Sequence, residues 1–274
     1  MMIKIKDYIN NNYTIKGELT FEYVNGICVV NCDSDVIVKN EEIEKLTDGF
    51  MWGEVEGDFD CSYCTNLISL EGAPTYVEGN FICDCCNNLT SLQGAPKEVG
   101  VNFICDCCHN LTSLEGAPQY VGGMFDCSNC SKLKSLEGAP KEVSEDFYCQ
   151  YCNNITSLEG APKEIGGSFN CHRCSSLKTL EGGPNIVTWD FVCTSCKELE
   201  SLVGAPKEIG GFFDCSRCIN LTSLKGAPKK VGWNFDCSNC TKLKSLEGAP
   251  KEIKGVLRYL DCPNLQSLQG ASKK

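Results

Sequence analysis

The stretch GGMFDCSNCSKLKSLEGAPKEV, residues 122–143, contains every feature of a unit that recurs along the chain. Phe125 and Cys127 are two residues apart with polar Asp126 between them, which is the period-two pattern of a short strand with one buried face. We expect Cys130 to close a turn, and the following leucines and valine to reach the same core around a Gly-Ala-Pro break. No segment of the unit is long enough for a good helix.

The unit recurs every 22 residues without insertion or deletion, and its tenth copy is degenerate, with Leu257 in place of the phenylalanine. A fixed period in this range indicates a solenoid, in which each unit is stable only when it is stacked on its neighbours. We predict a curved, right-handed β-solenoid with one short parallel strand per repeat and little helix, formed by ten repeats over residues 56–274. The repeated phenylalanines are Phe59, Phe81, Phe103, Phe125, Phe147, Phe169, Phe191, Phe213 and Phe235.

Residues 1–55 do not follow this period, and we predict that they form an N-terminal cap. Ile15, Leu19 and Phe21 have the composition of a small β structure. Without such a cap, the apolar face of the first repeat would meet water.

The repeat resembles the leucine-rich repeat. Counted from Gly122, its Phe, Cys, Cys and Leu stand at the fourth, sixth, ninth and twelfth positions, as in the leucine-rich spacing. The piece Asn-Leu-Thr-Ser-Leu, at residues 88–92, 110–114 and 220–224, is similar to the short bacterial type, although Glu-Gly replaces the first proline of that type. The consensus SLEGAPKEVGG-x-F-x-C also resembles repeat proteins encoded in phages and phage-like elements. This resemblance implies a solenoid scaffold and supplies no catalytic residue.

The net charge and the distribution of apolar residues exclude some classes of partner and indicate a cellular compartment. A formal charge of −11 argues against binding to a phosphate backbone, so no nucleic-acid partner is expected. The chain has no run of about 18 apolar residues, and its first residues lack the apolar stretch of a signal peptide. We therefore predict a cytoplasmic protein that does not enter a membrane.

The 23 cysteines are interpreted as reduced structural thiols, because the number is odd and no export signal is present. Both cysteines of each Cys-x-x-Cys lie on core columns, so no cofactor is expected, although metal binding and redox sensing remain alternatives. Cys85 and Cys107 differ, since they occupy the exposed turn position and are expected to be the most reactive thiols. Two adjacent repeats share this feature, and duplication of one repeat is the preferred explanation of that coincidence over a metal site. The best metal candidates are Cys83, Cys85, Cys86, Cys105, Cys107 and Cys108.

The outward positions beside each strand vary between repeats, whereas the core columns barely change. Large aromatic groups gather there among aspartates, which predicts an aromatic-anchored acidic site for a protein that presents Lys or Arg. We expect a non-enzymatic protein-binding module encoded by a phage or prophage, which binds through its concave strand face as a monomer or an end-to-end dimer. A metal-binding or redox-sensing protein, or a structural phage component, is the alternative. The predicted partner-binding residues are Asp126, Tyr148, Tyr151, Trp189, Phe212, Asp214, Trp233 and Asp236.

Overall fold

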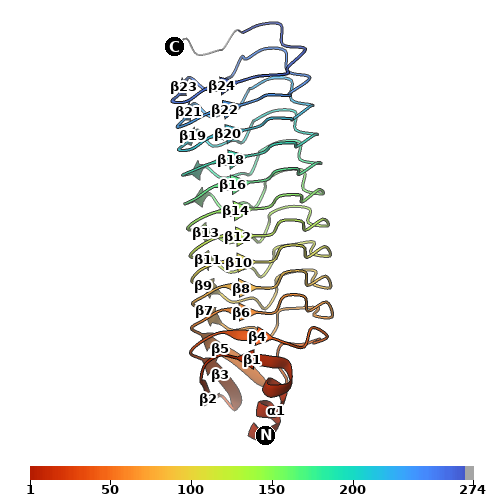
Figure 1. The fold of residues 1–274 in the computed structure, drawn as a ribbon, viewed down its shortest axis with the longest axis vertical. Helices are drawn as coiled ribbons and strands as arrows, with labels where there is room; N and C mark the ends of the chain where they lie inside the picture. Colours follow the sequence, from red (N-terminus) through yellow and green to blue (C-terminus); the bar gives the residue numbers. More distant parts are fainter. Residues whose placement is uncertain (269–274) are drawn as a thin grey trace.

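The computed structural model describes residues 1–268, which form an elongated β-solenoid of stacked turns (Figure 1). Its parallel strands follow the 22-residue period, and the described residues contain a single short helix. Each full turn contributes one strand to each of two sheets. Sheet A consists of β1 and the even-numbered strands from β4 onward, and sheet B consists of β2, β3 and the odd-numbered strands from β5 onward.

Sheet A carries the phenylalanine column. Successive phenylalanines pair in register, are fully buried, and stack with ring centroids 5.1 to 5.5 Å apart from Phe59 to Phe235. This continuous aromatic column supplies apolar burial at every turn. Its strands are β4 (Val36–Val38), β6 (Phe59–Asp60), β8 (Phe81–Ile82), β10 (Phe103–Ile104), β12 (Phe125–Asp126), β14 (Phe147–Tyr148), β16 (Phe169–Asn170), β18 (Phe191–Val192), β20 (Phe213–Asp214), β22 (Phe235–Asp236) and β24 (Leu257–Arg258).

Sheet B is formed by a second strand in each repeat. Only one strand per repeat was predicted from the sequence. In most turns this second strand consists of two residues, one exposed and one a buried valine or isoleucine, so it is too short to show a period-two pattern. Its strands in the stack are β5 (Phe50–Val55), β7 (Tyr76–Val77), β9 (Glu98–Val99), β11 (Tyr120–Val121), β13 (Glu142–Val143), β15 (Glu164–Ile165), β17 (Ile186–Val187), β19 (Glu208–Ile209), β21 (Lys230–Val231) and β23 (Glu252–Ile253).

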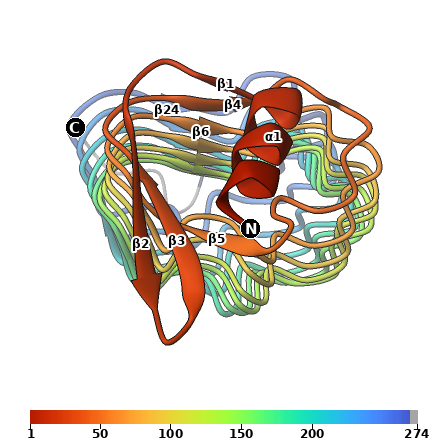
Figure 2. The ribbon, with the colours of Figure 1, turned by 90° about the horizontal axis from the view of Figure 1, so that it is seen from below.

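The N-terminal residues add a helix, α1 (Met2–Asn12), which was not expected from the sequence. Figure 2 shows α1 lying across the end of the stack, where Ile5 and Ile9 are buried against the core. Strand β1 (Tyr13–Ile15) then pairs antiparallel with β4, and β2 (Leu19–Val24) and β3 (Ile27–Cys32) form a hairpin. Parallel stacking therefore begins at β3 in sheet B, which pairs with β5, and at β4 in sheet A, which pairs with β6, so both sheets start within the residues predicted as cap.

The opposite end of the described stack is less covered. Leu257, which replaces the phenylalanine in the tenth repeat, is half-buried, and Leu260 is 70% exposed. A degenerate sequence is typical of a terminal repeat, which covers the end of the stack.

Candidate functional site

The eight predicted partner-binding residues do not form one patch, because they are distributed over several columns of the solenoid surface. Asp126, Tyr148, Asp214 and Asp236 all directly follow the core phenylalanine, point out of sheet A and are half-buried. Register pairs Asp126 with Tyr148, and Asp214 with Asp236. These four residues therefore share one column, as two adjacent pairs separated along the stack.

The two tryptophans lie at the corner where the chain passes from sheet B to sheet A. Trp189 and Trp233 are 56% and 60% exposed, and Gly211 holds the same position in the turn between them. Backbone hydrogen bonds continue through all three residues, from Gly211 N to Trp189 O and from Trp233 N to Gly211 O, each 2.9 Å. Phe212 follows Gly211 and is half-buried. Two indole rings thus project from one edge of sheet A with no side chain between them in the intervening turn.

Tyr151 lies at the other edge of sheet A, in the turn inside Cys-x-x-Cys. Its ring contacts the His172 ring at 5.4 Å and the Arg173 guanidinium at 5.6 Å between centroid and Cζ. The structure therefore places Tyr151 beside a cation and apart from the tryptophan edge.

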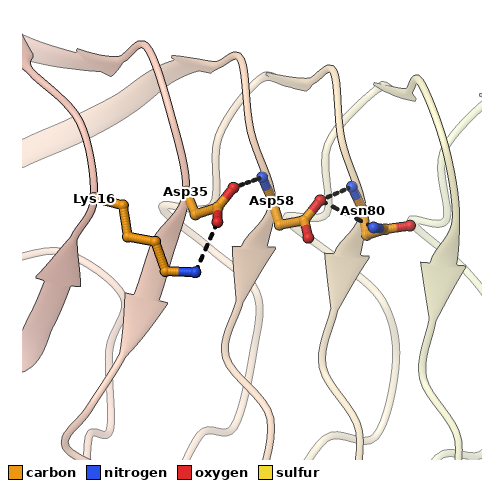
Figure 3. Close-up of polar contacts among 4 residues, drawn as sticks. All are labelled: Lys16, Asp35, Asp58 and Asn80. Atoms are coloured by element: carbon orange, nitrogen blue, oxygen red, sulfur yellow. Dashed lines mark hydrogen bonds and ion pairs between the residues drawn. The ribbon is translucent and has the colours of Figure 1, made fainter.

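The column just before the phenylalanines was expected to face outward, and it carries a ladder of polar side chains that is interrupted at Met124 and Phe212. Lys16 Nζ lies 2.9 Å from Asp35 Oδ2, and Asp35 Oδ1 accepts the Asp58 N–H at 2.9 Å. Asp58 Oδ1 accepts both the backbone and side-chain N–H groups of Asn80, as Figure 3 shows. The hydrogen bond from Asp58, followed by that from Lys16, lowers the pKa of Asp35. This column joins successive turns and connects the cap to the stack.

The in-register cysteines also bond between turns. From the second motif onward, the second thiol of each Cys-x-x-Cys donates to the backbone oxygen of the first cysteine in the preceding repeat, as from Cys86 to Cys61 (3.1 Å) and from Cys108 to Cys83 (3.2 Å). All 23 cysteines are free, and burial contributes to raising the pKa of those at the first position, such as Cys149 and Cys171. The thiol columns therefore supply hydrogen-bond donors to carbonyl groups in the core, in addition to apolar burial.

Cys85 and Cys107 lie on the surface, half-buried, in left-handed turns with φ of 57° and 58°. Burial, followed by the nearby Asp106 carboxylate, raises the pKa of Cys107 to about 12, and burial with Asp84 also raises that of Cys85. A raised pKa leaves little thiolate at neutral pH, and these two thiols are nevertheless less buried than the neighbouring in-register cysteines.

The six cysteines considered as metal ligands do not converge on one point. Cys83, Cys86, Cys105 and Cys108 are buried in the core, whereas Cys85 and Cys107 lie outside it. Across residues 1–268, no group of three or more histidine, cysteine, aspartate or glutamate residues has a geometry that could hold a metal ion.

Asp84 gives the solenoid a pH-dependent contribution to stability. Burial raises the pKa of Asp84 from 3.8 to about 6, so between these values the folded state binds more protons than the unfolded chain. The free energy of unfolding contributed by this group therefore falls as pH rises through that window. Asp84→Asn keeps an oxygen for the Asp106 N–H and removes the titration. We expect the variant to gain stability relative to the parent as pH rises from about 4 to 7.

Urea unfolding at both pH values measures this effect, with Glu142→Gln, an exposed residue of sheet B, as the control. A stability difference between Asp84→Asn and the parent that does not change with pH would contradict it.

Comparison with family models, with curated proteins and with solved structures finds no match for this chain. Within the described part of the chain, no helix has the length and apolar character needed to cross a bilayer.

Proposed function

We propose that this chain is a non-enzymatic protein-binding module, built on a leucine-rich-repeat-like solenoid of the short bacterial and phage type. Its partner presents Lys or Arg and docks on the tryptophan edge, defined as Trp189, Trp233 and the aspartates Asp214 and Asp236, which follow Gly211 and Trp233 by three residues. The observation that carries the proposal is the exposure of both indoles, 56% and 60%, on one column of a rigid scaffold.

The distance between Trp189 and Trp233 leaves room for a side chain from a partner. Strands stack about 4.8 Å apart, so the two tryptophans, two turns apart, are separated by about 10 Å. Gly211 leaves the space between them open. Tryptophan is enriched among residues that dominate binding energy, because it buries a large ring and loses little conformational freedom.

The neighbouring aspartates supply the charge preference. Asp214 and Asp236 lie directly opposite each other, and like charges in that arrangement repel. Burial, opposed by hydrogen bonds from Ser216, raises the pKa of Asp214, to which the Asp236 charge also contributes. A Lys or Arg from a partner would relieve this repulsion, in addition to any contact with the indoles.

The test is affinity capture from the producing cell, followed by identification of the retained proteins. Trp189→Ala combined with Trp233→Ala is compared with Val101→Ala, an exposed residue of the same corner column, four turns before Trp189. We expect a basic protein to be retained by the parent and by Val101→Ala and to be lost with the tryptophan pair. Equal retention by all three proteins would contradict docking at this edge.

The alternatives have their own readouts. Metal analysis and thiol counting on protein purified without reductant test the metal and redox functions, for which the proposal expects no bound metal and 23 free thiols. A cytoplasmic location agrees with this thiol content, because that compartment keeps cysteines reduced. Presence of the chain in purified phage particles would favour the structural role. Sedimentation separates a monomer from an end-to-end dimer, which would cover Leu257 and Leu260.

A further inference from the structure

A groove runs along the turns inside Cys-x-x-Cys, at the edge of sheet A opposite the tryptophans. The third residue of each motif adopts a left-handed φ of 54° to 61°, and its N–H donates to a backbone oxygen of the next turn, as from Arg173 to Thr194 (2.9 Å) and from Arg217 to Ser238 (2.8 Å). These turns therefore stack in register, and their side chains form one wall. Residues two positions further on form the other wall, around a volume of about 740 Å³.

The groove is positively charged although the chain as a whole is negative. Arg173, Lys197 and Arg217 line it, and no aspartate or glutamate does. Arg173 and Arg217 are two of the three arginines in a chain of formal charge −11. All three cations are exposed, and among the described residues none of them is within salt-bridge distance of a carboxylate. The guanidinium of Arg173 lies over the Tyr151 ring, which limits its freedom before any ligand arrives.

The spacing of the cations matches an extended peptide. Arg173 and Arg217 are two turns apart, about 10 Å at the spacing of stacked strands, and Lys197 comes from the turn between them on the other wall. A peptide in the extended polyproline II conformation has three residues per turn and advances about 3.1 Å per residue, so side chains three residues apart point to the same side and lie about 9 Å apart. Arginine binds carboxylates through two parallel hydrogen bonds, and Ser195 and Asn239 offer further polar groups to a peptide backbone.

The size and charge of the groove favour a short acidic segment over a nucleic acid. A polynucleotide would carry its phosphates past the three cations and over a surface that is negative overall, where repulsion grows with each charge. The charged part of a peptide with two or three carboxylates is no longer than the groove, so such a peptide avoids this repulsion. We propose that this groove, formed by the turns from Tyr151 to Asn239, binds an extended Asp- or Glu-containing segment of another protein. The tryptophan edge has the opposite charge preference, so this site does not depend on the function proposed for that edge.

Fluorescence anisotropy tests the proposal with a labelled 12-residue peptide that carries three glutamates spaced three residues apart. The comparison probes are the same peptide with glutamine at those positions and a labelled single-stranded DNA 12-mer. Arg173→Ala combined with Arg217→Ala removes the two guanidinium groups. Lys229→Ala combined with Lys251→Ala removes the same charge at exposed positions outside the groove and serves as the matched control. Circular dichroism confirms that both double variants are folded.

At about 50 mM salt, we expect the glutamate peptide to bind the parent at least about tenfold more tightly than the glutamine peptide or the DNA. The arginine pair should weaken this binding at least about tenfold, and the lysine pair by less than about twofold. Full retention is expected with the combined Trp189→Ala and Trp233→Ala variant. The proposal is overturned by any of four results: no binding of the glutamate peptide at millimolar protein, equal binding of the glutamine peptide, tighter binding of DNA, or equal losses in the two charge variants.

Discussion

Phe191→Ala is expected to lower the free energy of unfolding by about 3–5 kcal/mol, whereas Trp189→Ala, two residues earlier, should change it by less than about 1 kcal/mol. Phe191 is fully buried and stacks on Phe169 and Phe213 at 5.1 and 5.2 Å between ring centroids. Its removal leaves a cavity that the neighbouring rings cannot fill, because each is fixed by its own turn. The Trp189 ring is mostly in water, so its removal leaves no cavity in the core.

Urea unfolding followed by circular dichroism measures both changes. The core of a repeat protein is one-dimensional, so a cavity at Phe191 interrupts contacts on both of its sides. We therefore also expect the Phe191→Ala transition to broaden as the two halves of the stack lose their coupling. A cost for Trp189→Ala as large as that for Phe191→Ala would show that the indole packs into the fold and cannot serve as a binding anchor.

Gly160→Ala is expected to cost about 2–5 kcal/mol, from backbone strain of about 1–2 kcal/mol together with a steric clash of about 1–3 kcal/mol. Gly160 has a φ of +93°, and a Cβ atom there would lie 2.2 Å from Glu137 N and 2.4 Å from Leu136 C. Those atoms belong to the backbone of the preceding turn and cannot move aside without separating the stacked turns. A glycine with positive φ holds this position in the other repeats from Gly72 to Gly248.

Gly26→Ala provides the matched control. Gly26 has a φ of +81° in the β2–β3 hairpin, but apart from Gly26 and its two chain neighbours no heavy atom lies within 4 Å of the point that an alanine methyl carbon would occupy there. This variant should show the strain alone, about 1–2 kcal/mol. Thermal unfolding of the two variants separates the clash from the strain. Equal losses of stability in the two variants would mean that the turns can move apart to accept a methyl group. The close approach of the turns would then not explain the glycine at this position.

Prediction from sequence was most successful where one residue type repeats at one position. Phe125 and Cys127 are fully buried, as their alternation with Asp126 predicted, and so is Cys130, which was predicted to lie on a core column. A register without insertions requires every turn to place the same residue at the same point, so a parallel solenoid follows from the period itself. The strands of sheet B were not predicted because two residues with one buried side chain carry no periodic signal. Helix α1 was not predicted because only Ile5 and Ile9 of its 11 residues are buried.

The candidate site was harder to predict, because its residues are related only through folding. Trp189 and Tyr151 were grouped as outward aromatic residues, but one lies at the corner with sheet B and the other in the turn beside Arg173. The basic groove has no signal along the chain, since its arginines are 44 residues apart and come together only because the chain completes two turns between them. The bonds from cysteine thiols to carbonyl groups likewise join residues 25 positions apart.

The amino-acid sequence by itself determined the repeat length, the buried columns and the stacking of the turns, because these depend on a local pattern of apolar residues repeated without interruption. The tertiary structure decided which outward residues share an edge, which polar side chains bond between turns, and where positive charge gathers on a negative chain. These properties depend on the path of the backbone between the core columns. That path is set by corners such as Gly211 and by the left-handed turns at Arg173 and Arg217, through contacts with neighbouring turns.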